Sequence, residues 1–322
     1  MSGVFLLKRN MKTLEVSLIN LFITAEKDDY IFFECDTYIF KLQQLASPSA
    51  QKECVNETRI TTHLFIENFE ANDVPNILNT IDNICLLLSF ATQTFVYRKE
   101  YKIDSLSTDR MVHQYTINPP NPIIPLNGKA LREFIETTYP TFKKLKSTRQ
   151  LIVIFGYLCE ANRSTLALEI ALISHYVAIE NLKNTFALDN RYEYSGQHFT
   201  HKDFPPLDNP PTNVEDYWLP KGKRKKYVHK MYGQITSTEM TLRMFEASHF
   251  NRDEITPFLM KRHRMIHEGI LLPLGDENYM GQAIEDRRDV SDLLRKYLLT
   301  LLNYKGAYYL SRDRLGASGY IP

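Results

Sequence analysis

The sequence has few cysteines, and their spacing supports neither a disulfide framework nor a zinc site. Cys35, Cys54, Cys85 and Cys159 are scattered through 322 residues without a CxxC pair. Structural zinc sites and disulfide-rich folds both need clustered cysteines. We therefore expect no metal, no cofactor and a reducing compartment, the cytoplasm.

The sequence also lacks an excess of charge and a long apolar run. The formal net charge is only +1, so any attraction to nucleic acid or to an anionic membrane must be local. The most apolar run, residues 84–96, is shorter than the roughly 20 residues that span a bilayer. The apolar stretch at the N-terminus is too short for a signal peptide and is followed at once by charged residues. We expect no membrane interaction and no secretion.

The chain is long enough for two ordinary domains and rich enough in hydrophobic residues, 43%, to fold both. Residues 1–120 contain short runs of β-branched and aromatic residues that partly alternate with polar ones, as in residues 59–66, which is typical of strands. One helix is predicted within them, capped at Asn72 or Asp73, with Pro75 in its first turn. This part is predicted to be a β-rich sensor or recruitment domain.

The proline-rich residues 118–125 predict a stiff interdomain linker. From residue 126 to 322 helical periodicity dominates. The predicted helices span residues 129–145, 149–155, 164–188, 227–247, 252–269 and 289–302, with Asp289 and Ser291 as candidate caps of the last one. Residues 190–220 are predicted to be a long loop. The fold class predicted for the chain is thus α+β, with a β-rich domain followed by an all-α helical bundle.

The residues most typical of chemistry lie in the predicted helix 252–269. Arg262 and His263 are followed by Met265 and Ile266 and then by His267. An arginine can bind a scissile phosphate through two donors, and a histidine can exchange a proton near neutral pH. This pair suits RNA cleavage by the internal 2′-hydroxyl, which needs no metal. The same spacing recurs at Arg224 and His229, which lack the combination of a polar second residue, an apolar pair before the histidine and a position between two predicted bundle helices.

Arg262, the polar His263 and His267 together resemble the Arg-x4-His motif of the HEPN superfamily. The His-Glu-Gly sequence at 267–269, residues 173–182 and residues 293–309 are similar to ApeA-type HEPN proteins in particular. Residues 86–92 are similar to the domain that those proteins carry ahead of the bundle.

The resemblance implies a metal-independent RNA endonuclease that leaves 2′,3′-cyclic phosphate and 5′-hydroxyl ends. Arg262 would bind the phosphate, His267 would act as acid or base, and His263 would support them. The resemblance also implies a homodimer, because HEPN domains commonly pair with their motifs facing each other. By fold-level analogy the setting is antiphage defence through abortive infection, with a possible phage-derived trigger.

Helix geometry adds a constraint on the motif. Five positions at about 100° each place Arg262 and His267 about 140° apart on a regular helix, so either the helix bends or a second copy completes the site. By contrast His263 and His267, four residues apart, share one face. The alternative is that Arg262, His263 and Arg264 form a solvated basic face with His267 near the helix end.

Two further groups of residues are candidates. The basic run that includes Lys223, Arg224, Lys225 and Lys226 could follow an RNA backbone or be simply solvated. Glu180, inside the predicted helix 164–188, could orient Arg262 or His267, or it could pair with Lys183. The alternative function for the whole chain is a noncatalytic HEPN-like module for dimerisation or for RNA or nucleotide binding.

Overall fold

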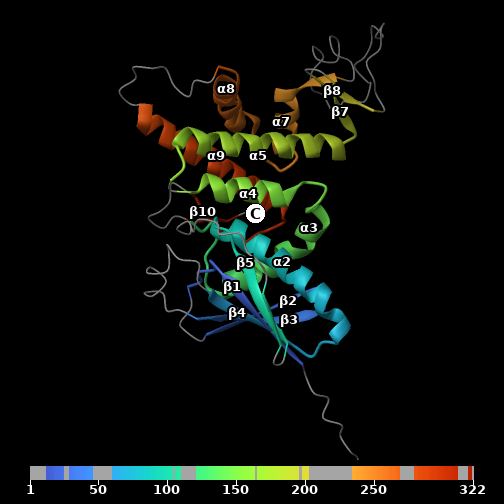
Figure 1. Cartoon of the computed structure of the whole chain (residues 1–322). Helices are drawn as coiled ribbons and strands as arrows, with labels where there is room; N and C mark the ends of the chain where they lie inside the picture. Colours follow the sequence, from blue (N-terminus) through green and yellow to red (C-terminus); the bar gives the residue numbers. More distant parts are fainter. Residues whose placement is uncertain are drawn as a thin grey trace, which may run out of the picture. The chain divides into compact units, whose positions relative to one another are not determined.

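The structure is a computed structural model of the 322-residue chain. It describes residues 12–24, 29–45, 60–103, 106–109, 121–163, 165–195, 198–202, 234–268, 279–310 and 318–320. The fold is α+β, with antiparallel strands in the N-terminal part and helices after them, as the sequence predicts (Figure 1).

The chain forms two compact units. The first consists of residues 1–144, 158–167 and 298–322, and the second of residues 145–157 and 168–297. The units are therefore interleaved along the chain. Whether residues 1–120 and 126–322 are domains that fold and act separately stays a prediction.

The first unit is built on a six-stranded antiparallel sheet. Its strands are β1 (Thr13–Ile19), β2 (Tyr30–Cys35), β3 (Tyr38–Gln44), β4 (Ile60–Glu67), β5 (Tyr97–Ile103) and β6 (Leu106–Asp109). They are ordered β2-β3-β4-β1-β5-β6. Burial alternates along β2 and over most of β4, so one face of the sheet is packed and the other is more open.

The packed face lies against α2 (Val74–Thr92), which follows the short 3-10 helix η2 (Ala71–Asp73) (Figure 1). Pro75 lies in the first turn of α2, as predicted. The Asp73 side chain does not cap α2 and instead accepts a hydrogen bond from the backbone N–H of Glu70. Its carboxylate therefore stabilises the preceding turn.

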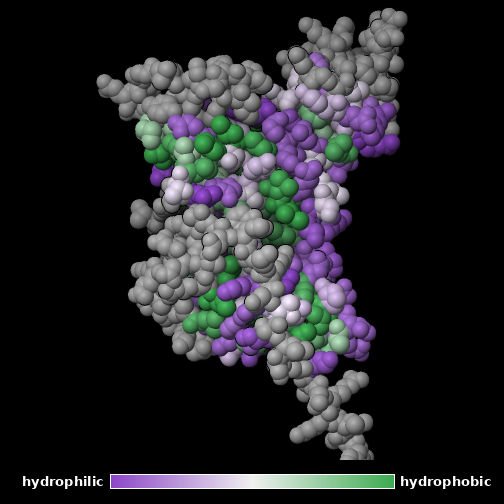
Figure 2. Space-filling model, in the orientation of Figure 1, coloured by the Kyte–Doolittle hydropathy of each residue, from purple (hydrophilic) through white to green (hydrophobic). Residues whose placement is uncertain are grey.

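Within the described residues, one helical stretch, residues 71–92 (η2 together with α2), is long and apolar enough, by length and composition, to cross a membrane. Of its most apolar window, 61% is buried inside the protein, which is the behaviour of a core helix. On the side drawn in Figure 2, hydrophobic patches on the coloured residues are interrupted by hydrophilic ones.

Helix α3 (Gly128–Leu145) and the end of the chain also belong to the first unit. The rings of Phe134 and Tyr304 meet edge to face, with centroids 5.4 Å apart. Strand β10 (Ala307–Tyr309) pairs with β11 (Ser318–Tyr320). The part of the predicted linker that the structure describes is packed: Ile123 is fully buried and its backbone N–H donates to Ala91. Because the Ile123 side chain is apolar and buried, this part of the predicted linker packs into the first unit.

The second unit is mainly helical. Its helices are α5 (Leu168–Asp189), α7 (Ser237–Glu246) and α8 (Arg252–Glu268), together with most of α4 (Leu151–Ala161) and of α9 (Tyr279–Leu301). Helix α5 packs against α7 and α8. The rings of Phe245 and Tyr297 contact edge to face at 5.1 Å in its core.

Three short strands interrupt the region predicted to be a loop followed by helices only. Strands β7 (Tyr192–Ser195), β8 (His198–His201) and β9 (Gln234–Thr236) form an antiparallel sheet. The expectation of an all-α second part is corrected on this point. These strands have three or four residues each, which is too short for an alternating pattern to stand out.

Two predicted helix starts are also wrong. The helix predicted from residue 227 begins at Ser237, because residues 234–236 form β9 and Thr236 caps α7. Helix α9 begins at Tyr279, ten residues before the predicted start. Asp289 and Ser291 therefore lie inside α9 and do not cap it.

Candidate functional site

Two helices of the second unit bring Arg262 and Glu180 together. Tyr176, Glu180 and Lys183 lie on α5 at spacings of four and three residues, which places them on one helix face. Arg262 lies on α8, which packs against α5. Its Nη2 atom is 2.5 Å from Glu180 Oε1. The structure thus joins the motif arginine to the carboxylate that the sequence analysis paired with it.

The ion pair between Arg262 and Glu180 is largely shielded from water. The exposed fraction of the side chain is 12% for Arg262 and 26% for Glu180. The contact is an ion pair by distance, but its angles are not those of a hydrogen bond. A second donor of the guanidinium, Arg262 Nε, has no hydrogen-bond partner within the described residues. A largely shielded arginine with an unused N–H donor retains capacity to bind an anion or a water molecule.

Glu180 is shared with a second, more deeply buried cation. Lys183 has a 3% exposed side chain, and its Nζ lies 2.5 Å from Glu180 Oε2. The same Nζ donates to Ser237 Oγ at 2.7 Å and lies 5.3 Å from the centroid of the Phe199 ring. Burial lowers the pKa of Lys183, and the charge of Glu180 partly offsets that effect. Lys183 thereby ties Glu180 to the start of α7 and to β8.

Tyr176 adds an unpaired hydroxyl to this region. It is 1% exposed, and its hydroxyl has no hydrogen-bond partner within the described residues. Burial raises its pKa, the charge of Asp286 raises it further, and the charge of Arg262 lowers it. Asp286 on α9 is itself ion-paired with Lys261 of α8 and accepts a hydrogen bond from Gln282.

Among the described side chains of this cluster, the ionised groups leave a small positive excess. Arg262, Lys183 and Lys261 supply three positive charges, while Glu180 and Asp286 supply two negative ones, so the sum is +1. Lys261 is half-exposed, but Arg262 and Lys183 are largely shielded, and a net charge of +1 in such surroundings favours an anion such as a phosphate over a cation.

The other predicted site residues are only partly placed. The backbone of His263 and of His267 lies in α8, while their side chains fall outside what the structure describes. The basic residues predicted to contact RNA lie outside the described residues altogether: Lys223, Arg224, Lys225 and Lys226.

Helix α8 runs through the whole motif. Its backbone is helical from Arg252 to Glu268, and its one internal proline, Pro257, lies five residues before Arg262. On a regular helix the Cβ atoms of Arg262 and His267 then point about 140° apart. The helix does not end or break between the two motif residues, which bears on how a complete site would be assembled.

Sequence reasoning missed three members of this cluster: Tyr176, Ser237 and Asp286. Tyr176 lies among apolar residues of α5, so its pattern is that of a core residue. Ser237 lies in the interior of the predicted helix 227–247, whereas it is the first residue of α7. A usable signal was the pair Thr236 and Glu239, which has the spacing of a helix N-terminus.

Comparisons with known proteins leave the family open. No family model, no curated protein and no solved structure matches this chain. In the part of the chain that the structure describes, no group of three or more His, Cys, Asp or Glu side chains is placed to hold a metal ion.

Proposed function

We propose that this protein is a metal-independent RNA endonuclease of the HEPN type that works as a homodimer in the cytoplasm. The observation that supports it most directly is the position of Arg262. The arginine of the Arg-x4-His motif is largely shielded, is held by Glu180, and keeps an unused donor. Such preorganisation suits a residue that offsets charge on a phosphate in a transition state.

The proposed reaction is a transesterification within RNA. The 2′-hydroxyl attacks the adjacent phosphorus, a base takes its proton, and the 5′-oxygen of the next nucleotide leaves with a proton from an acid. Arg262 would offset the charge that develops on the non-bridging oxygens. His267 would serve as base or acid, and His263, on the same face of α8, would support it.

The geometry of α8 supports a site assembled from two chains. Arg262 and His267 are about 140° apart on one continuous helix, so a single phosphate meets both most easily when each comes from a different copy. A symmetric dimer would create two such sites. The basic run Lys223, Arg224, Lys225 and Lys226 would add salt-dependent contacts to the RNA backbone.

We further propose that the sheet-bearing N-terminal part recognises a trigger, which would be phage-derived if the protein acts in antiphage defence by abortive infection. One observation favours the rival function, a noncatalytic HEPN-like module for dimerisation or for RNA or nucleotide binding. The charge of Arg262 is already met by Glu180, as it would be in a purely structural ion pair.

The deciding experiment is cleavage of total RNA by the purified chain in the presence of EDTA. We expect cyclic phosphate and 5′-hydroxyl ends from the wild type, and a loss of at least 100-fold in rate for Arg262→Ala and for His267→Ala. Arg288→Ala is the matched control, because Arg288 is a half-exposed arginine of the same unit whose ion pair within the described residues is with nearby Glu285.

Each outcome separates the two functions. Equal activity of Arg288→Ala and wild type, beside inactive Arg262→Ala, supports the nuclease. Cleavage that survives both motif substitutions moves the site elsewhere, with Arg224 and His229 as the next pair to change. RNA binding without cleavage, in the wild type and in all variants, supports the rival module.

A further inference from the structure

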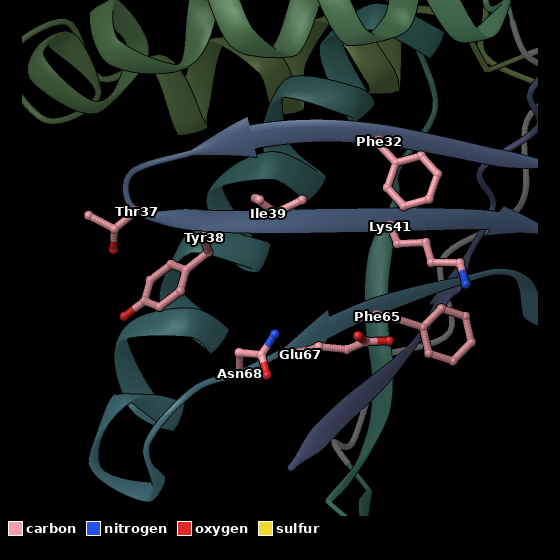
Figure 3. Close-up of a pocket in the computed structure, with 8 residues that line it drawn as sticks. All are labelled: Phe32, Thr37, Tyr38, Ile39, Lys41, Phe65, Glu67 and Asn68. Carbon is pink, nitrogen blue, oxygen red and sulfur yellow. The ribbon is translucent and has the colours of Figure 1, made fainter. Parts of the chain in front are cut away.

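The open face of the six-stranded sheet carries large aromatic side chains near its β2 edge. Along β2 the buried residues alternate with exposed ones, and Tyr30 and Phe32 are 46% and 51% exposed. Strand register places Lys41 beside Phe32 and Phe65 beside Lys41. Figure 3 shows these three side chains in a row across β2, β3 and β4.

A shallow pocket of about 480 Å³ lies on this face. Its apolar part is formed by Phe32, Ile39 and Phe65, and Ile39 is 65% exposed. Its polar part includes Lys41 and Glu67 (Figure 3). Exposed apolar side chains next to an edge strand promote aggregation, so a cluster of them marks an interaction site more often than a random surface.

The aromatic side chains already hold one cation. Lys41 Nζ lies 3.8 Å from the centroid of the Tyr30 ring and 5.9 Å from that of Phe65. Within the described residues Lys41 forms no ion pair with a carboxylate. Its contacts are therefore cation–π contacts, which shows that these rings face a space that accepts a positive group.

The rim of the pocket is acidic. Glu67 lines it, and Glu34 lies directly across the strands from Ile39. Both carboxylates are exposed, and neither forms an ion pair inside the described part of the chain. The pKa of Tyr38, another lining residue, is raised by burial first and then by the negative charges of Asp73 and Asp36. The two carboxylates outnumber the single ammonium of Lys41, which also lines the pocket. This excess of one negative charge disfavours a polyanion such as RNA and favours a cation.

We propose that this surface, formed by Tyr30, Phe32, Ile39, Phe65 and Glu67, binds a segment of another protein in which an arginine or lysine lies beside an aromatic or large aliphatic residue. The apolar side chain would pack between Phe32 and Ile39. The cationic side chain would stack on Phe65 and pair with Glu67. This binding site is independent of the proposed ribonuclease site, so either can fail without the other.

The test is a selection from a random hexapeptide display library on the full-length chain. We expect enriched peptides to combine arginine or lysine with tryptophan, phenylalanine or leucine. Their affinity, measured with labelled synthetic peptides by fluorescence anisotropy, should fall at least tenfold for Phe32→Ser. Ile170→Ser should leave it unchanged, because Ile170 is 52% exposed on α5, outside this surface.

A charge reversal covers the case in which Phe32→Ser does not fold. Glu67 is exposed, so Glu67→Lys should fold normally and should shift the selected peptides toward acidic ones. The proposal is overturned if no peptide is enriched, or if enriched peptides bind both variants as tightly as the wild type. It is also overturned if a decauridine oligonucleotide, rather than any peptide, loses binding in Phe32→Ser, since that result would assign the surface to single-stranded RNA.

Discussion

The carboxylate of Glu180 pairs with two cations, the buried Lys183 and the largely shielded Arg262. Arg262 approaches one of its oxygens and Lys183 the other. From the sequence, Glu180 could be expected to contact Arg262 or Lys183, because both are plausible partners of a carboxylate inside an apolar helix. That it contacts both could not be predicted, since the position of Lys183 depends on Ser237 and on Phe199 of β8, which are distant in sequence.

The shared carboxylate leads to a stability prediction for Lys183→Met. Methionine keeps the shape of the stem, but Glu180 loses one of two cations and Ser237 loses its donor, so the free energy of unfolding should fall by about 2 kcal/mol. Urea denaturation measures it. Arg288→Met, which removes an exposed pair with Glu285, should change it by less than about 0.5 kcal/mol. Equal effects of the two variants would show that Lys183 is not held as described.

A second residue, His175, makes stability depend on acidity. It is 3% exposed on α5, and its Nδ1 donates to the Ala171 carbonyl. Burial and the charges of Arg287 and Arg295 lower its pKa to about 3, although the hydrogen bond to Ala171 acts in the opposite direction and raises it. Between about pH 6.5 and 3 this histidine is therefore protonated in the unfolded chain and neutral in the folded chain. The free energy of unfolding falls as the pH falls through this window.

Replacement of His175 should remove that dependence. In His175→Gln, glutamine keeps a neutral N–H donor. Between pH 7 and pH 4 the free energy of unfolding of the wild type should fall by about 3 kcal/mol more than that of His175→Gln. The measurement is urea denaturation at both pH values. His249→Asn keeps His175 and should keep the wild-type difference. An unchanged pH dependence in His175→Gln would contradict the buried neutral state.

At the scale of elements, strongly periodic segments were predictable and short or polar ones were not. Helices α2 and α5 lie within a few residues of their predicted ranges, because apolar residues recur over several turns. The first ten residues of α9 were missed, because Gly281 and a run of charged residues mask the period. Strands β7, β8 and β9 are held together by tertiary pairing that no local pattern reveals.

The start of α7 can be tested through its cap. The Thr236 hydroxyl accepts a hydrogen bond from the Glu239 backbone N–H, and this bond helps to position Ser237 against Lys183. Thr236→Ala should lower the free energy of unfolding by about 1 kcal/mol. The exposed Thr238 of the same turn is the control, and Thr238→Ala should have a much smaller effect in thermal or urea unfolding. Equal losses in the free energy of unfolding for the two variants would show that the Thr236 side chain does not stabilise α7 as a cap.

At the scale of the molecule, the fold class followed from the change of hydrophobic period along the chain, whereas the grouping into compact units did not. Helix α3 meets the chain end through Phe134 and Tyr304 and meets the sheet through the hydrogen bond that the Tyr139 hydroxyl donates to Asp36, between β2 and β3. The candidate site was likewise only partly predictable, because it too depends on long-range contacts. Its arginine was found through a motif, and its surrounding buried charges were found only once α5, α7, α8 and α9 were placed.

The proposed dimer can be tested by mixing inactive chains. If each site takes Arg262 from one chain and His267 from the other, a mixed dimer of Arg262→Ala with His267→Ala contains one intact site. Equal amounts of the two chains, unfolded and refolded together, give mixed dimers in half of the population. RNA cleavage should then recover to about a quarter of the wild-type rate.

Two controls decide how that recovery is interpreted. Each variant refolded alone should stay inactive, and size-exclusion chromatography should show dimers of the 37.6 kDa chain in every sample. A mixture that stays inactive while dimers form would place Arg262 and His267 of one chain in the same site. In that case the two side chains must converge despite their separation of about 140° on a regular helix, and α8 would have to bend between them.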